Sequence, residues 1–98
     1  MIRSIVYHPK VPKEVRAFID HYESISQELG DSFWCELMEV IDYARDFPER
    51  HHFDRTGRRR SNLKRFPVHI LFRLFPDFIR ITAVRHDHQN PEYAARRQ

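Results

Sequence analysis

The first half of the chain carries one strand pattern and two helix patterns. Apolar and polar residues alternate over residues 2–7, which predicts a short strand. Over residues 12–29 and again over residues 33–47, apolar residues recur at spacings of three and four, which predicts two amphipathic helices. Gly30 is expected to end the first helix, because glycine adopts the left-handed conformation of a helix end at little cost. One of the polar residues just after Gly30 is expected to cap the second helix. So short a connection makes the two helices antiparallel neighbours.

The second half carries three strand patterns. They cover residues 60–66, 68–75 and 78–85, and the Pro-Asp pair at 76–77 predicts a tight reversal between the last two. In the middle strand, one face is expected to hold Val68, Ile70, Phe72 and Leu74, and the other His69, Leu71, Arg73 and Phe75. In the last strand, Ile79, Ile81 and Ala83 are expected to oppose Phe78, Arg80, Thr82 and Val84. Pro91 suits the first turn of a short final helix through Tyr93 to Arg96.

Neither predicted helix can bury its apolar stripe alone. The apolar stripes of the two helices are therefore expected to pack on one face of a sheet formed by the predicted strands, in which consecutive strands run antiparallel. At 98 residues, the chain has room for one domain, residues 1–98, with one hydrophobic core.

Charge is divided unevenly along the chain. Residues 1–54 hold six Lys or Arg against eleven Asp or Glu, a net charge of 6 − 11 = −5, and residues 55–98 hold eleven against three, a net charge of +8. An anionic partner would be steered to the second half, although the two halves can also neutralise each other across the fold. No segment approaches the roughly 20 apolar residues of a membrane helix and no signal-peptide pattern opens the chain, so we expect a cytoplasmic protein. The single cysteine, Cys35, fits a reducing compartment.

The order of these elements resembles the RelE/ParE family of bacterial type II toxins, also known as plasmid-stabilisation toxins. The likeness covers essentially the whole chain. It rests on the helix pair ending in Phe47-Pro48, the Arg-rich strand leading to Leu63 and Phe66-Pro67, the apolar strand over 68–74, and the Ala83-Val84-Arg85-His86 run followed by Pro91, Tyr93 and Arg96. The resemblance implies an α+β fold in which a helical hairpin covers one face of a mostly antiparallel sheet.

The resemblance also implies partners. It implies a cognate antitoxin, usually encoded beside the toxin, that wraps the toxin and neutralises it. One branch of the family cleaves mRNA in the ribosomal A site, and another poisons DNA gyrase and performs no chemistry of its own. We expect translation inhibition by a ribosome-dependent mRNA endoribonuclease that uses no metal or other cofactor. The alternatives are a ParE-like gyrase poison and a decayed member that keeps only antitoxin binding.

RNA cleavage through the 2′-hydroxyl needs a base, an acid and cations that stabilise the growing charge. Histidine suits both proton transfers near neutral pH, and tyrosine can stack on a base or transfer a proton. The candidate catalytic residues are His69, His86, His88 and Tyr93. The candidate phosphate- and RNA-binding residues are Arg60, Arg65, Arg73 and Arg85. The alternative for Tyr93 is a purely structural role, in which its ring packs the last predicted helix against the sheet.

The family pattern matches these candidates in part. Tyr93 falls where RNase members place their C-terminal tyrosine, and Arg60 falls on the strand where they place a cationic residue. His69 stands at a position often held by Arg, and Asp87 and Gln89 stand in a tail where many relatives have Arg, which weakens the case for a nuclease. The histidine pairs at 51–52 and 86–88 lack the companion ligands of a metal site, so no metal is expected.

Overall fold

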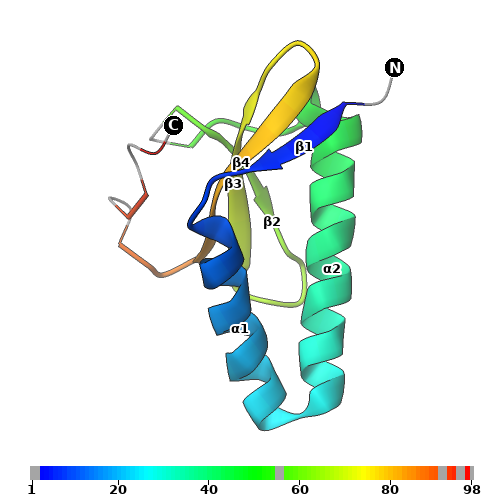
Figure 1. The fold of residues 1–98 in the computed structure, drawn as a ribbon, viewed down its shortest axis with the longest axis vertical. Helices are drawn as coiled ribbons and strands as arrows, with labels where there is room; N and C mark the ends of the chain where they lie inside the picture. The colour runs from blue at the N-terminus through cyan, green and yellow to red at the C-terminus, as the bar shows by residue number, and fades with distance from the viewer. Residues whose placement is uncertain (1–2, 55–56, 91–92, 95–96, 98) are drawn as a thin grey trace.

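The computed structural model describes residues 3–54, 57–90, 93–94 and 97. Within these residues, a hairpin of two helices packs on one face of a four-stranded sheet (Figure 1). The helices are α1, Val11–Ile25, and α2, Gln27–Asp46, and a 3-10 turn, η1, Pro48–Arg50, follows them. The strands are β1, Ser4–Tyr7, β2, Arg59–Asn62, β3, Val68–Leu74, and β4, Phe78–His86. The predicted helix pair and strands are confirmed, although the strand expected over 60–66 is shorter.

The sheet is mostly antiparallel, as the resemblance implied. Its strand order is β1-β4-β3-β2, with β2 and β4 antiparallel to β3. Strand β1 pairs parallel with β4, in a register that sets Ser4 opposite Phe78. Parallel neighbours need a long crossover between them, and the helical hairpin lies within the crossover that leads from β1 back to the sheet.

The helical hairpin turns at Ser26, so the prediction that Gly30 ends the first helix is wrong. Ser26 has an extended backbone, its N–H donates to Tyr22 O, and its hydroxyl accepts a hydrogen bond from the N–H of Leu29 at 3.0 Å. Serine is a favoured N-cap because its oxygen satisfies an N–H that the first helical turn leaves without a partner. Gly30 lies inside α2 instead, where an added Cβ would collide with Cγ of Glu23 on α1. Glycine here lets the two helices approach closely.

A bulge in β4 reverses the predicted alternation of its side chains. Leu71 pairs with Ala83 but Phe72 pairs with Ile81, so Thr82 is the extra residue. The predicted grouping is therefore wrong beyond Ile81: Val84 joins the core under the helices, while Ala83 lies opposite Leu71 on the other face. The Thr82 hydroxyl is buried and donates to the Leu71 carbonyl at 3.3 Å.

The core lies between the hairpin and the helix-facing side of the sheet. The grouping predicted for β3 is confirmed, since Val68, Ile70 and Phe72 all belong to this core, whereas His69 and Leu71 do not. Aromatic rings join the layers: Phe33 of α2 contacts Tyr22 of α1 and also Phe66, with ring centroids 5.1 and 5.4 Å apart. Aromatic contacts of this kind add to the stabilisation from burial alone.

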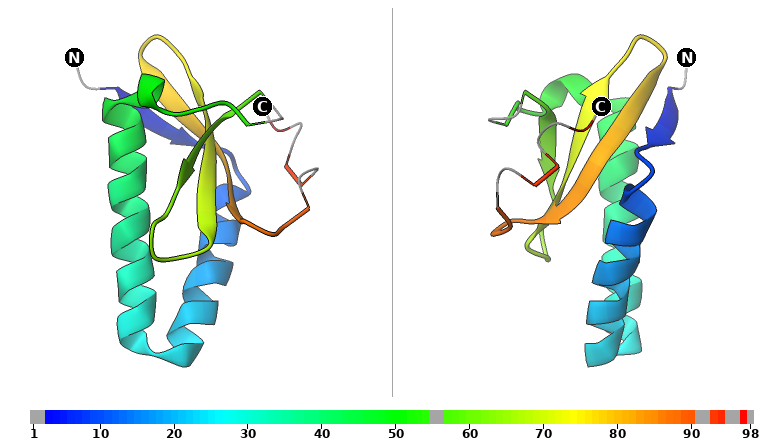
Figure 2. Two further views of the ribbon diagram at one scale, coloured as in Figure 1. Left: turned by 180° about the vertical axis from the view of Figure 1, so that it is seen from behind. Right: turned by 60° about the vertical axis from the view of Figure 1, so that its left-hand side comes forward.

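The segment after β4 lies on the side of the sheet away from the helices (Figure 2). The final helix expected over residues 91–96 falls largely outside the described residues. Of its described members, Tyr93 and Ala94 form a turn, and Ala94 has a φ of 63°. Within it, the Tyr93 carbonyl accepts a hydrogen bond from Arg85 of β4.

Candidate functional site

The outer face of the sheet, away from the helices, gathers several of the predicted cationic residues. Residues directly opposite each other in a sheet share a face. His69 pairs with Arg85, Arg60 pairs with Leu71, and Arg73 pairs with Arg80. Because His69, Leu71 and Arg73 point away from the core strip of β3, their partners do too. The register therefore places Arg60, His69, Arg73 and Arg85 on one face.

The bulge at Thr82 is what brings Arg85 to this face. Without the extra residue, Arg85 would follow Ile79, Ile81 and Ala83 toward the helices. With it, Arg85 stands beside His69, and its Nε donates to His69 Nε2 at 2.8 Å. A guanidinium has no acceptor, so His69 Nε2 must be the acceptor and Nδ1 carries the ring proton.

Both ring nitrogens of His69 are occupied by protein partners. The protonated Nδ1 donates to Asp87 Oδ1 at 2.7 Å, and the side chain is only 1% exposed. Burial lowers the pKa of His69 below its ordinary 6.5 and outweighs the hydrogen bond with Asp87, which raises it. His69 is thus a buried, neutral imidazole with no nitrogen left for a substrate.

Arg85 is buried almost as deeply as His69. Its guanidinium is 4% exposed, and it donates to Asp54 Oδ2 at 3.2 Å and to the Tyr93 carbonyl at 3.0 Å. Burial lowers the pKa of Arg85, while Asp54 raises it. A buried charge is tolerated when it is paired and hydrogen-bonded in this way. Arg85 joins the loop before β2 to the segment after β4.

Arg60 stands at the rim of the same network. Its NH2 group lies 3.5 Å from Asp87 Oδ1, and its Nε donates to Asn62 Oδ1 at 2.8 Å. We name the five connected residues Asp54, Arg60, His69, Arg85 and Asp87 the outer-face network. Within it two cations meet two carboxylates and one neutral ring, so its charges balance internally.

Tyr93 is attached to the first helix by its phenol. The hydroxyl donates to Glu14 Oε2 at 2.5 Å, and Arg97 makes an ion pair with the same oxygen at 2.7 Å. Glu14 Oε1 accepts the N–H of Val84 at 3.2 Å, on a part of β4 that lies beyond the paired residues of β1. The hydrogen bond to Glu14 raises the pKa of Tyr93 above its ordinary 10.0, and burial raises it further. The phenol is therefore held in its protonated form.

His86 and His88 lie at the end of β4, closer to solvent than His69. Their ring centroids are 5.4 Å apart, and His86 Nδ1 accepts the N–H of His88 at 3.1 Å. The Gln89 side chain accepts the N–H of His86 at 3.3 Å. Of the three predicted catalytic histidines, His86 is half-buried and His88 is exposed, so these two reach the molecular surface.

The remaining two predicted phosphate ligands make contacts away from the outer-face network. Arg65 belongs to the turn before β3 and pairs with Glu36 of α2, its Nε donating to Oε1 at 2.9 Å. The guanidinium of Arg73 stacks on the Phe75 ring at 5.2 Å, toward the β3–β4 turn. The structure therefore brings together Arg60, His69 and Arg85. Arg73 shares their face of the sheet but contacts Phe75, while Arg65 and the phenol of Tyr93 contact helix residues.

Sequence reasoning missed the carboxylates that engage the candidate residues. They are Glu14, Glu36, Asp54 and Asp87. A general signal existed, since a cation predicted within an apolar strand requires a counter-charge if it is buried. The identity of that counter-charge depends on packing between residues up to 83 positions apart, as for Arg97 and Glu14.

The described part of the chain holds no group of three or more His, Cys, Asp or Glu side chains placed to bind a metal ion. Nor do its helices include one long and apolar enough to cross a membrane.

Comparison with known proteins is informative at the level of structure. No family model matches the chain, and no curated protein matches it significantly. A solved structure described as the chromosomal ParDE TA system from P. aeruginosa matches with a TM-score of 0.74 at 20% sequence identity. The match covers 87% of this chain and 96% of that chain. At this sequence identity, the likeness is evidence for the fold alone. It confirms that the two helices and the mostly antiparallel sheet form a ParE-like α+β structure.

Proposed function

We propose that this chain is the toxin of a type II toxin–antitoxin system and that it acts by binding its target, without chemistry of its own. The observation that carries the choice is the burial of the His69–Arg85 pair within a ParE-like fold. DNA gyrase is the target that the resemblance to the family offers for such a toxin, and a cognate antitoxin is its neutralising partner.

The contacts of the candidate residues favour binding over RNA cleavage. A general base must reach the proton that it removes, and both nitrogens of His69 are already hydrogen-bonded inside the protein. A phosphate ligand must expose its guanidinium, and that of Arg85 is 4% exposed. The raised pKa of Tyr93 opposes its use as a base. The outer-face network and the Glu14–Tyr93 contact are better explained as structural ties.

The experiment is controlled expression of the chain in a bacterial host, combined with an assay on purified gyrase. Gyrase is incubated with the chain and relaxed plasmid, and linearised DNA is measured after detergent treatment. In parallel, the 5′ ends of cellular mRNA are mapped. We expect linear plasmid to accumulate and no codon-phased mRNA ends to appear. Codon-phased ends with an unaffected gyrase would overturn the binding mechanism, and normal growth on strong expression would contradict a toxin of either kind.

A matched set of variants separates the two mechanisms. Tyr93→Phe and the double variant His86→Ala/His88→Ala remove the remaining groups capable of proton transfer, and Lys13→Ala on the exposed side of α1 serves as the control. A toxin that acts by binding keeps its toxicity in the His86/His88 double variant. Loss of toxicity in that variant, with the thermal midpoint unchanged, would support catalysis.

The second candidate function is the ribosome-dependent mRNA endoribonuclease. One observation favours it: His86 and His88 stand 5.4 Å apart, near the surface, at the end of a strand from the basic half of the chain. Two neighbouring imidazoles can serve as base and acid for a 2′-hydroxyl attack. The mRNA mapping and the double variant described above test it directly.

A further inference from the structure

His69 takes part in the outer-face network through both of its ring nitrogens. Nδ1 donates to Asp87 Oδ1 at 2.7 Å, and Nε2 accepts a hydrogen bond from Nε of Arg85 at 2.8 Å. The ring can fill both roles only while it is neutral, because a protonated imidazole has two donors and no acceptor. The network is therefore complete in only one protonation state of a single side chain.

Arg85 extends this dependence to two segments outside the paired strands. Its NH2 group donates to Asp54 Oδ2 at 3.2 Å, in the loop before β2, and its NH1 group donates to the Tyr93 carbonyl at 3.0 Å, after β4. The loop also lies along the edge of the sheet, where the His52 carbonyl accepts the N–H of Arg60 at 2.9 Å. A change at the imidazole thus reaches the loop through one guanidinium.

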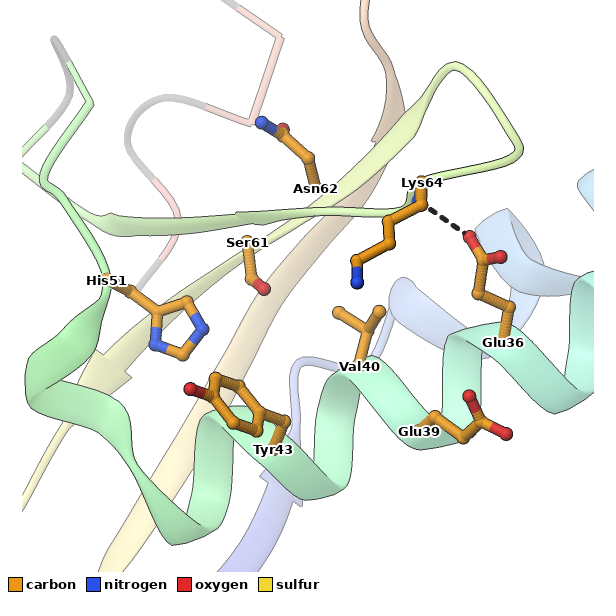
Figure 3. A pocket seen from close by; sticks show the side chains of 8 residues that line it. All are labelled: Glu36, Glu39, Val40, Tyr43, His51, Ser61, Asn62 and Lys64. Atoms are coloured by element: carbon orange, nitrogen blue, oxygen red, sulfur yellow. Dashed lines mark hydrogen bonds between the residues drawn. The ribbon is translucent and has the colours of Figure 1, made fainter.

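The groups that face the His69 ring come from the two neighbouring strands and the segment after β4. Arg85 lies on β4, Asp87 follows that strand, and Arg60 lies on β2 with its NH2 group 3.5 Å from the same Asp87 oxygen. Asn62 of β2 pairs with His69, and its side chain points away from α2 (Figure 3). Its amide oxygen accepts Nε of Arg60 at 2.8 Å. The charged groups that act on the ring are thus two cations and one carboxylate among the described residues.

A second proton on His69 has no partner in this arrangement. It would lie on Nε2 and meet the Nε–H of Arg85, so two donors would face each other at 2.8 Å. The side chain is 1% exposed, so water cannot separate the two positive charges. Asp87 would hold a charged ring more strongly through Nδ1, which leaves the guanidinium as the group that moves. On the side of α1, the phenol of Tyr22 adds no positive charge, and its pKa is raised by burial and by Asp87.

We propose that the outer-face network is an acid-sensitive latch, in which a proton on Nε2 of His69 displaces Arg85 and frees the loop that carries Asp54 from β4. The helical hairpin stays folded, because the core lies on the other face of the sheet. Tyr93 loses its carbonyl contact but keeps the hydrogen bond from its phenol to Glu14. In the open form the outer face carries one additional positive charge, and the displaced guanidinium reaches solvent.

Opening of the latch is coupled to the uptake of a proton. In the closed form, burial holds the pKa of His69 below its ordinary 6.5, and exposure in the open form returns the pKa toward that value. The open form therefore binds the proton more tightly, and the opening equilibrium constant rises as the pH drops below about 6.5. With one proton involved, the rise between about pH 7.5 and pH 5.5 is up to about tenfold. The latch depends on buried contacts alone, so it does not require the chain to be a toxin.

Amide hydrogen exchange followed by NMR tests the latch in the full chain. The N–H of Arg60 reports contact with the loop, and the N–H of Phe33, buried in α2, reports global unfolding. After correction for intrinsic exchange rates, the protection factor of Arg60 should decrease roughly three- to tenfold from about pH 7.5 to pH 5.5, while that of Phe33 stays constant. An equal decrease at both amides, or a change below about twofold at Arg60, would overturn the proposal.

Two variants assign the effect to one imidazole. His69→Gln keeps a neutral side chain whose amide can accept from Arg85 and donate to Asp87, so the protection factor of Arg60 should no longer change with pH. The matched control is His88→Gln, which replaces an exposed imidazole and should respond as the parent protein does. A response that persists in His69→Gln, or that is lost in His88→Gln, contradicts the proposal.

The parent protein provides a test that does not depend on the folding of either variant. The ring nitrogens of His69 are titrated by 15N NMR in the same sample as the exchange measurement. The midpoint of the ring titration and the midpoint of the change at Arg60 should coincide, because one proton drives both. Separate midpoints would contradict the latch.

Discussion

Replacing Glu36 by alanine is expected to destabilise the protein more than any exposed change on α2. Its carboxylate accepts the N–H groups of Lys64 at 2.8 Å and Arg65 at 3.1 Å, together with the Arg65 Nε at 2.9 Å, and its side chain is 10% exposed. These hydrogen bonds join the middle of α2 to the turn between β2 and β3. The matched control is Glu39→Ala, three residues further along the helix and exposed to solvent.

The magnitude depends on the hydrogen bonds that the substitution removes. A hydrogen bond to a charged group contributes roughly 1.5–3 kcal/mol, but water can replace it at donors in an exposed turn. The Arg65 side chain is 63% exposed, so its ion pair adds at most about 1 kcal/mol. We expect a total decrease of about 2 kcal/mol in the free energy of unfolding, which for a domain of this size lowers the thermal midpoint by roughly 8–16 °C. Glu39→Ala should stay within about 0.5 kcal/mol of the parent protein.

The pH dependence gives a second test of the same hydrogen bonds. Burial raises the pKa of Glu36, but the hydrogen bonds from Arg65 and Lys64 outweigh burial and bring it below the ordinary 4.5. The unfolded chain therefore takes up the proton first as the pH falls. The stabilisation is complete above about pH 4.5 and decreases as the pH drops through the folded-state pKa. We measure the thermal midpoints of the parent protein and of Glu36→Gln by circular dichroism. The difference between the two midpoints should become smaller from pH 7 to pH 3. The reasoning would be refuted if Glu36→Gln lowered the thermal midpoint no more than Glu39→Gln does, or if its effect did not change with pH.

Three further outcomes are expected. Glu14→Gln should lower the pKa of Tyr93 toward 10, as measured by NMR titration of ring-labelled tyrosine, and an unchanged pKa would show that Glu14 does not set it. Burial lowers the pKa of His69 in the folded protein, so stability should fall as the pH drops below the unfolded-state pKa near 6.5. The thermal midpoint should therefore depend less steeply on pH between pH 7 and pH 5 in His69→Gln than in the parent protein. Gly30→Val should cost roughly 1–3 kcal/mol by pushing α2 away from Glu23, and a denaturation midpoint equal to that of the parent protein would mean that the helices can separate freely.

The amino-acid sequence determined the elements and their order. Apolar spacings of three and four marked both helices, and the alternation in β3 correctly grouped Val68, Ile70 and Phe72 on one face. These patterns are local, because each reports which side of one element avoids water. The resemblance added the arrangement of the hairpin on the sheet, which the structural likeness confirms.

Only the tertiary structure decided where the two helices break, which side chains of β4 face the core, and whether the candidate residues are buried or exposed. The sequence pattern predicted the helix break at Gly30, but the break lies at Ser26, because the closeness of the packed helices reserves Gly30 for a contact with Glu23. The bulge at Thr82 depends on pairing with β3, and it alone turns Arg85 toward His69. Burial of these two side chains depends on Asp54 and on the segment containing Tyr93, which are distant in sequence. A residue's type shows what chemistry it can perform, but its exposure and partners decide whether that chemistry is available, and both arise only when separate segments pack together.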